Sequence, residues 1–196
     1  MNLNNDCAEV SIMPLIIVRN DITKMSVDAI VNAANSQMLG CFVPGHNCID
    51  NAIHTFAGVQ LRAACHAMME RQGHGEPTGQ AKITPGFNLP AQYVLHTVGP
   101  IVNGKPTEED EALLAFCYRS CLELARQNQI GSVAFCCIST GEFHFPNQRA
   151  AEIAIQTVRQ YQKRTNSGMK VIFNVFKTAD WDIYRKLLGA DPKAEK

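Results

Sequence analysis

The stretch that decides the fold runs from Ala29 to Gly58 and reads AIVNAANSQMLGCFVPGHNCIDNAIHTFAG. It opens with an apolar run typical of a buried strand and then passes two amide side chains, Asn32 and Asn35, into a loop. From Asp50 onward, apolar residues recur at helical spacing. We therefore expect a buried strand, a loop and a helix in succession, which is the unit from which α/β domains are built.

The loop of this stretch contains three potential metal ligands, Cys41, His46 and Cys48, within eight residues. Thiolate sulfur and imidazole nitrogen are ligands that zinc prefers in proteins. The alternative is a coincidence of buried cysteines with a structural histidine, because free cysteine is among the residue types most often buried. We interpret the pattern Cys-x4-His-x-Cys as a site for one zinc ion per chain.

A tetrahedral zinc site needs a fourth ligand, and the second ligand pair that marks a zinc finger is absent from this pattern. An open fourth position is typical of catalytic zinc, whereas a fourth protein ligand would make the site structural. The candidates for such a fourth protein ligand are His54, Cys65 and His66.

Asp50 stands at the expected start of the helix, two residues after Cys48. An aspartate there can cap the free backbone N–H groups of the first turn. A carboxylate beside a catalytic metal can also act as a general base toward water. The two roles are compatible, and the sequence leaves both open.

The composition excludes several classes of protein. Lys plus Arg and Asp plus Glu each number 18 among 196 residues, so there is no excess of basic residues for nucleic-acid binding. The eight cysteines include Cys136 and Cys137, which are adjacent in an expected buried strand, and this favours a reducing compartment. The first residues, MNLNNDCAEV, do not resemble a signal peptide, and no apolar run approaches a membrane span. We expect a soluble, cytoplasmic protein that binds neither nucleic acid nor membrane.

Apolar runs and helical periodicity alternate along the chain. The expected strands cover 14–18, 29–32, 81–85, 93–98, 133–138 and 169–176. The expected helices cover 50–71, 108–127, 147–163 and 179–188, and Gly58 makes the first of these either two helices or one kinked helix. Asp21 is expected to accept a hydrogen bond in a turn or helical cap.

Strands that are apolar throughout and alternate with helices predict a largely parallel sheet covered by helices on both faces. The chain is long enough for one such domain, and no repeat or linker divides it. We expect a lead-in at 1–13, a single domain at 14–189 and a flexible C-terminal tail at 190–196.

Ligands of such folds bind where the carboxyl ends of the strands open into loops. Three expected loops qualify, at 35–48, 99–106 and 139–146. The last follows a buried strand and precedes a helix, and its small residues Ser139, Thr140 and Gly141 leave backbone N–H groups free to hold an anion. Together with the zinc loop, it predicts a pocket with a phosphate end and a metal end.

Several of these segments resemble motifs of the macrodomain family, whose fold binds ADP-ribose. The motifs are DIT at 21–23, VNAAN at 31–35, IDNAIH at 49–54, VLHTVGP at 94–100, STG at 139–141 and FP at 145–146. They occur in the family's order, and the resemblance extends from about Pro14 to Leu188. It implies a three-layer α/β/α macrodomain fold with a mixed, largely parallel central sheet.

One segment departs from the common hydrolytic macrodomains. Where those have a glycine run, this chain has GCFVPGHNC at 40–48, and His144 replaces a glycine of the later loop. Both differences resemble the zinc-dependent macrodomains, a branch often encoded beside sirtuin-type ADP-ribosyltransferases. The resemblance therefore implies zinc held by Cys41, His46 and Cys48 beside the anomeric carbon of the distal ribose.

The resemblance also assigns ligand-binding roles. Asp21 would accept the adenine amino group, Ile22 would offer a backbone contact, and Asn174 and Phe176 would lie near the adenine. Asn35 would hold the distal ribose, and Asn32 belongs to the same motif. The pyrophosphate would be wrapped by the backbone of Ser139, Thr140, Gly141, Glu142 and Phe143, with Phe145 packed against the ribose.

The resemblance favours a zinc-dependent hydrolase that removes ADP-ribose from proteins by cleavage at C1″ of the distal ribose. Asp50 and Asn35 would be its catalytic residues, although whether the zinc ion or Asp50 activates the water stays open. The implied linkage is O-linked, with a lipoyl-carrier protein modified by a partner sirtuin among the possible substrates. The alternatives are a non-catalytic ADP-ribose reader with a loop-shaping zinc and a structural zinc module that binds another protein.

Overall fold

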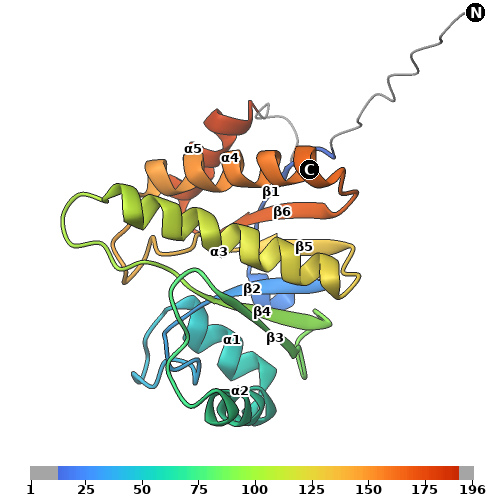
Figure 1. The fold of residues 1–196 in the computed structure, drawn as a ribbon, viewed down its shortest axis with the longest axis vertical. Coiled ribbons are helices and arrows are strands. Elements are labelled where there is room, and N and C mark those ends of the chain that lie inside the picture. Colours follow the sequence, from blue (N-terminus) through green and yellow to red (C-terminus); the bar gives the residue numbers. More distant parts are fainter. Residues whose placement is uncertain (1–12, 190–196) are drawn as a thin grey trace, which may run out of the picture.

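The computed structural model describes residues 13–189, so the expected tail at 190–196 and all of the expected lead-in except Met13 lie outside it. A six-stranded sheet forms the centre, in the order β1-β6-β5-β2-β4-β3 (Figure 1). All neighbouring strands are parallel except β3, which is antiparallel to β4. The strands are β1 (Ile16–Arg19), β2 (Ala29–Ala34), β3 (Ala81–Pro85), β4 (Tyr93–Val98), β5 (Ser132–Phe135) and β6 (Lys170–Val175).

Five α-helices and one short 3-10 helix accompany the sheet over these residues. They are η1 (Ile22–Lys24), α1 (Ile49–Ala57), α2 (Val59–Gln72), α3 (Glu108–Gln127), α4 (Asn147–Thr165) and α5 (Thr178–Leu188). Figure 1 shows α3 and α4 side by side across the sheet, where the hydroxyl of Tyr161 in α4 donates to the carbonyl of Leu122 in α3. Among the described residues, no helix is both long and apolar enough to cross a membrane.

Helices cover both faces of the sheet, as expected for strands that are apolar throughout. Ala29 of β2 pairs with Val133 of β5, so Phe135 shares the face of Ala29, whereas Asn32 points to the opposite face. Phe135 packs against Tyr118 of α3, with 5.0 Å between ring centroids. Asn32 instead contacts α1. The core therefore lies in two layers, one on each side of the sheet.

The expected elements match the observed ones closely, with differences of up to three residues at their ends. The expected helix at 50–71 is two helices, because Gly58 has φ 90° and ψ 175°, a conformation that breaks the helix and that residues with a side chain rarely adopt. The strand expected at 133–138 ends at Phe135, because the chain then turns, with Thr140 N–H donating to the carbonyl of Cys137. Helix α4 extends two residues beyond 163.

Five strands run parallel to one another, so their carboxyl ends lie at one edge of the sheet. The segments that follow β1, β2, β4, β5 and β6 leave the sheet there. These include the two loops in which the sequence predicts metal ligands and an anion site. The topology alone therefore brings segments from positions 20 to 180 together.

Candidate active site

A cavity of about 900 Å³ opens at the carboxyl edge of the sheet. Most of the predicted site residues line it: Asp21, Ile22, Asn35, Cys41, His46, Cys48, Asp50, Ser139, Thr140, Gly141, Glu142, Phe143, Asn174 and Phe176. The volume falls in the range of small-molecule and cofactor sites. Residues that are distant in the sequence thus share one ligand-sized space.

Two predicted ligand residues do not line this cavity, Asn32 and Phe145. Asn32 is fully buried because its side chain points down from β2 toward α1. Phe145 is 1% exposed and belongs to the hydrophobic core. Neither residue therefore faces the cavity in which the sequence predicts the ligand to bind.

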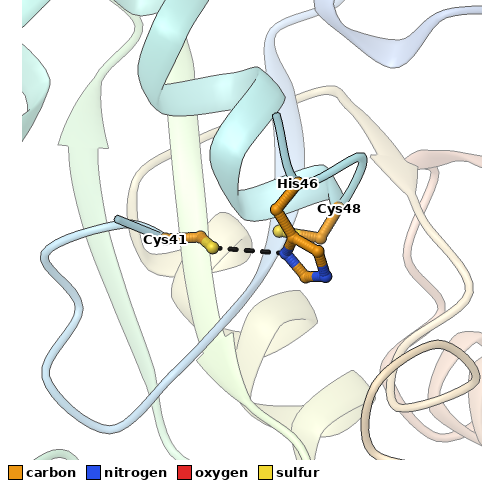
Figure 2. Close-up of side chains that lie close together, drawn as sticks. All are labelled: Cys41, His46 and Cys48. Carbon is orange, nitrogen blue, oxygen red and sulfur yellow. Dashed lines mark hydrogen bonds between the residues drawn. The ribbon is translucent and has the colours of Figure 1, made fainter. Parts of the chain in front are cut away.

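The predicted metal ligands converge (Figure 2). The Sγ atoms of Cys41 and Cys48 and a ring nitrogen of His46 lie within 4.8 Å of one another. Cys41 Sγ and His46 Nδ1 are 3.3 Å apart. Zn–S and Zn–N bonds of roughly 2.3 and 2.0 Å in a tetrahedron place such a pair about 3.5 Å apart. The donor set and its spacing therefore fit a zinc ion.

Side chains from α1 and α2 hold the metal loop in shape. Arg62 of α2 donates from Nη1 to the carbonyl of Leu39 at 2.6 Å, and its guanidinium lies 4.2 Å from the ring centroid of Phe42. Asn51 of α1 donates from Nδ2 to the carbonyl of Cys41 at 3.2 Å. The loop is therefore preorganised by protein contacts that do not involve a metal.

The three donors differ in their tendency to ionise. The Val43 backbone N–H and, to a smaller extent, the His46 ring lower the pKa of Cys41. Burial raises the pKa of Cys48, and the charges of Cys41 and Asp50 raise it further. Contacts with Cys41 and Glu142 raise the pKa of His46. A divalent cation bound here would favour the thiolate form of both cysteines.

None of the three candidates for a fourth protein ligand joins this group. His66 lies on the surface of α2, with its Nε2 3.3 Å from Glu70. His54 and Cys65 are buried elsewhere, clustered with His96. Among the described residues, only Cys41, His46 and Cys48 make up the cluster that faces the cavity.

Asp50 is a buried carboxylate at the floor of the cavity, 5% exposed. Its Oδ1 accepts a 2.8 Å hydrogen bond from Nδ2 of Asn32, and its Oδ2 accepts one of 3.3 Å from Nδ2 of Asn35. Burial raises the pKa of Asp50, and the bond from Asn32 opposes this shift. Asn32 and Asn35 thus hold the side chain of Asp50 between them.

Asp50 does not cap helix α1. The helix begins at Ile49, and the capping residue is Cys48, whose Sγ accepts a 3.4 Å hydrogen bond from the backbone N–H of Asn51. Asp50 is therefore already inside the first turn, and its side chain turns inward to β2. The capping alternative for Asp50 is wrong, because the helix starts one residue earlier than the sequence pattern indicates.

A second layer of buried polar groups lies beneath Asp50. Asn32 Nδ2 also lies 3.2 Å from Nδ1 of His96. Since the amide is a donor, Nδ1 accepts and Nε2 carries the proton, which it donates to Thr84 Oγ1 at 2.9 Å. Burial lowers the pKa of His96 to about 3, so its ring is neutral. Sequence reasoning missed His96 and Thr84, although the VLHTVGP segment was marked as a motif.

The loop after β5 forms the other wall of the cavity. Backbone turns shape it, with Phe145 N–H donating to Ser139 O at 2.9 Å and His144 N–H to Gly141 O at 3.0 Å. A Cβ atom added to Gly141 would meet no heavy atom within 4 Å. The backbone at Gly141 is therefore open to a ligand in the cavity.

The far end of the cavity is formed by the segments after β1 and β6. Asp21 caps η1, where its Oδ1 accepts from the backbone N–H of Thr23 at 3.0 Å. Asn174 donates to the carbonyl of Asn20 at 3.0 Å, and Phe176 is 75% exposed. A free aromatic face beside a carboxylate and an amide suits a planar heteroaromatic ring.

Some residues that line the cavity carried no signal in the sequence. Asp180, at the start of α5, is buried and accepts a 2.6 Å hydrogen bond from Asn147 of α4. Thr55 and Phe56, which lie on α1, also line the cavity. Their spacing is that of an ordinary helix, so only the tertiary structure shows that they face the cavity.

The fold and this cleft define an α/β domain that binds a ligand at the carboxyl edge of its sheet. The model of the Macro domain family matches residues 31–154, and the chain belongs to this family. The resemblance read from the sequence is confirmed at the level of the family and of its fold.

Relatives and solved structures agree with this assignment. The chain is 62% identical over 171 residues to a Protein-ADP-ribose hydrolase of Treponema medium, covering 87% of this chain and 66% of that protein. It is 52% identical over 178 residues to a protein of the same name from Staphylococcus aureus, covering 90% and 67%. This chain therefore spans about two thirds of the length of these relatives.

Two solved structures with bound nucleotides are also similar. An Oceanobacillus iheyensis macrodomain with ADP superposes with a TM-score of 0.81 at 42% identity, covering 88% of each chain. A Trypanosoma brucei macrodomain in complex with ADP-ribose gives a TM-score of 0.78 at 34% identity, covering 94% of this chain and 73% of that one.

Proposed function

We propose that this protein is a zinc-dependent hydrolase that removes ADP-ribose from mono-ADP-ribosylated proteins. The observation that carries the proposal is the convergence of three zinc-type ligands and the buried carboxylate of Asp50 on one cavity that also contains the loop 139–146. The names of the Treponema and Staphylococcus relatives support the activity. The ligands of the Oceanobacillus and Trypanosoma structures support a nucleotide with a diphosphate in the cavity.

The ligand would lie along the cavity with its adenine near Asp21, Ile22, Asn174 and Phe176. The diphosphate would lie against Ser139, Thr140, Gly141, Glu142 and Phe143, and the distal ribose between Asn35 and the metal loop. Asn32 and Phe145 would act from beneath by holding Asp50 and the loop in place. All contacts in this arrangement come from residues that line the cavity or support its floor.

The reaction would release the acceptor oxygen from C1″ of the distal ribose. Water attacks C1″, the bond from C1″ to the acceptor oxygen breaks, and the acceptor oxygen gains a proton. Asp50, fixed by Asn32 and Asn35, would orient the water and accept its proton. A zinc ion held by Cys41, His46 and Cys48 would supply Lewis-acid polarisation of an oxygen.

The proposed substrate carries an O-linked modification. Departure of an acceptor oxygen is the chemistry that a Lewis acid promotes. The similarity of the metal loop to the zinc-dependent branch supports a sirtuin-type ADP-ribosyltransferase as the source of the modification. It also supports a lipoyl-carrier protein as one acceptor.

The direct test uses a protein carrying one O-linked ADP-ribose and follows release of free ADP-ribose by mass spectrometry. We expect multiple turnovers with zinc-loaded enzyme and loss of turnover after zinc is removed with a chelator, with recovery on adding zinc back. A protein that binds ADP-ribose but releases none from any linkage would be a reader instead, and the hydrolase proposal would be wrong.

A further inference from the structure

The two ring nitrogens of His46 face two different loops. Nδ1 lies 3.3 Å from Cys41 Sγ, within the metal loop that follows β2. Nε2 lies 3.3 Å from Oε1 of Glu142, in the loop that follows β5. Both loops line the same cavity. This pair is therefore a contact across the cavity between the metal loop and the loop assigned to the diphosphate.

The arrangement has the form of an outer-shell contact of a metal-binding histidine. A histidine that binds a metal through one nitrogen usually donates its other N–H to a carboxylate or carbonyl, which fixes the ring's tautomer and orientation. Nδ1 is the ring nitrogen that faces the other proposed zinc ligands. If Nδ1 binds the metal, the proton of a neutral His46 ring is on Nε2, facing Glu142. A small rotation of the exposed Glu142 side chain would turn this contact into a hydrogen bond.

The position of Glu142 also needs an explanation of its own. A carboxylate in a loop that receives a diphosphate would repel the ligand if it pointed at the phosphates. Its side chain is 69% exposed and turned toward His46. Its orientation toward His46 would keep its negative charge away from a diphosphate held by this loop.

We propose that Glu142 is a positioning residue that joins the metal loop to the diphosphate loop and makes zinc and ADP-ribose binding mutually reinforcing. This inference rests on the proposed zinc site and ligand orientation. Zinc would fix the His46 ring, His46 would hold Glu142, and Glu142 would hold the loop in its ligand-binding shape. Coupling of this kind is reciprocal, so each ligand increases the affinity for the other by the same factor.

The experiment compares Glu142→Ala and Glu142→Gln with a matched control, Glu70→Ala. Glu70 is an equally exposed carboxylate, 68% against 69%, and it also lies 3.3 Å from a histidine nitrogen, but it lies on α2 and does not line the cavity. Zinc affinity is measured by competition with a chromophoric chelator. ADP-ribose affinity is measured by calorimetry on zinc-loaded and zinc-depleted protein.

We expect Glu142→Ala to bind zinc about 10-fold more weakly than wild type, the lower end for outer-shell partners because this carboxylate is exposed. Wild type should bind ADP-ribose about 5-fold more tightly with zinc than without, and this ratio should approach one in Glu142→Ala. Glu142→Gln, which keeps an acceptor but not the charge, should fall between. Glu70→Ala should match wild type in both measurements.

The two proposals fail in different ways. If the wild type binds no zinc, the proposed zinc chemistry and this inference are both wrong. If the wild type binds zinc but Glu142→Ala binds it equally well, only the inference is overturned. The same holds if the zinc-dependent ratio of ADP-ribose affinities is unchanged in Glu142→Ala. Unchanged thermal unfolding of the variants would show that the differences do not come from the fold.

Discussion

Asn32 Nδ2 donates a 2.8 Å hydrogen bond to Oδ1 of Asp50, so the second strand is joined to the first turn of α1 directly beneath the cavity. Asn32 has no exposed surface and does not line the cavity, whereas Asp50 does. The proposed catalytic carboxylate is therefore oriented by a residue that does not line the cavity.

The first prediction separates orientation from ligand contact. Asn32→Ala removes one donor from a buried carboxylate, which costs about 1–3 kcal/mol of stability. We expect the hydrolysis rate to fall at least about 10-fold, because the proposed general base is no longer held in place, with little change in ADP-ribose affinity by calorimetry. Asn128→Ala, at the end of α3, is the control and should be silent. An equal loss of affinity and rate would show that Asn32 contacts the ligand, as predicted from the sequence.

The second prediction concerns Asp50 itself. Asp50→Ala leaves the diphosphate loop and the far end of the cavity untouched, so ADP-ribose should still bind. Loss of a general base typically lowers the rate by ~10²–10⁴-fold. Single-turnover release of ADP-ribose measures this loss, with Asp182→Ala on α5 as a control outside the cavity. A variant with wild-type turnover would show that Asp50 has no part in the chemistry.

The third prediction concerns the metal. Purified protein should contain about one equivalent of zinc, and Cys48→Ala should lose it while keeping a cooperative thermal transition, because Arg62 and Asn51 hold the loop. Loss of the helix cap made by Cys48 should cost about 1 kcal/mol. Cys137→Ala, which changes another cysteine of the cavity, should keep its zinc. An unfolded zinc-free protein would mean that the metal is structural.

The fourth prediction tests the diphosphate loop. The Cβ of a residue at 141 points into open space, so Gly141→Glu should fold normally and keep zinc. Its carboxylate would lie against the phosphates, and like charges ~4 Å apart at an effective dielectric near 20 repel by about 4 kcal/mol, roughly a thousandfold in affinity. Gly141→Ala is the control and should bind far better. Normal ADP-ribose binding by Gly141→Glu would show that the ligand does not follow this loop.

The fifth prediction concerns stability against pH. Burial lowers the pKa of His96 to about 3 and that of His54 to about 4, from 6.5. The unfolded chain therefore binds these protons first, and stability is lost as pH falls below 6.5, by up to about 1.4 kcal/mol per pH unit for each histidine. Asp50, whose pKa is raised, acts in the opposite direction, because the folded chain binds its proton before the unfolded chain does.

Urea unfolding at pH 6.5, 5.75 and 5 measures this dependence, above the range in which most carboxylates titrate. His96→Gln should weaken the pH dependence of the free energy of unfolding by the equivalent of about one proton. A wild-type stability that does not change over this interval would contradict the neutral, buried state of both rings.

Much of the fold was predictable because its signals are local. The expected ranges at 81–85, 93–98 and 108–127 coincide with β3, β4 and α3. Periodicity and capping residues specify such elements without knowledge of their partners. Strand ends were less predictable, as at Phe135, because they depend on where the chain turns after the sheet.

The sequence by itself determined the order of strands and helices, and hence which loops share the carboxyl edge of the sheet. It also determined that the three proposed zinc ligands, Cys41, His46 and Cys48, lie close together, since they share one short loop that a few side chains hold in shape.

The tertiary structure alone decided the contacts between distant segments. Asp50 pairs with Asn32, and Asn32 is in turn supported by His96. His46 meets Glu142, which lies in a loop far along the chain. Side-chain direction sets them all: alternation along β2 turns Asn32 away from the cavity, and the start of α1 at Ile49 turns Asp50 inward. No local pattern encodes which residues meet across a sheet or a cavity, because that depends on how the whole chain packs.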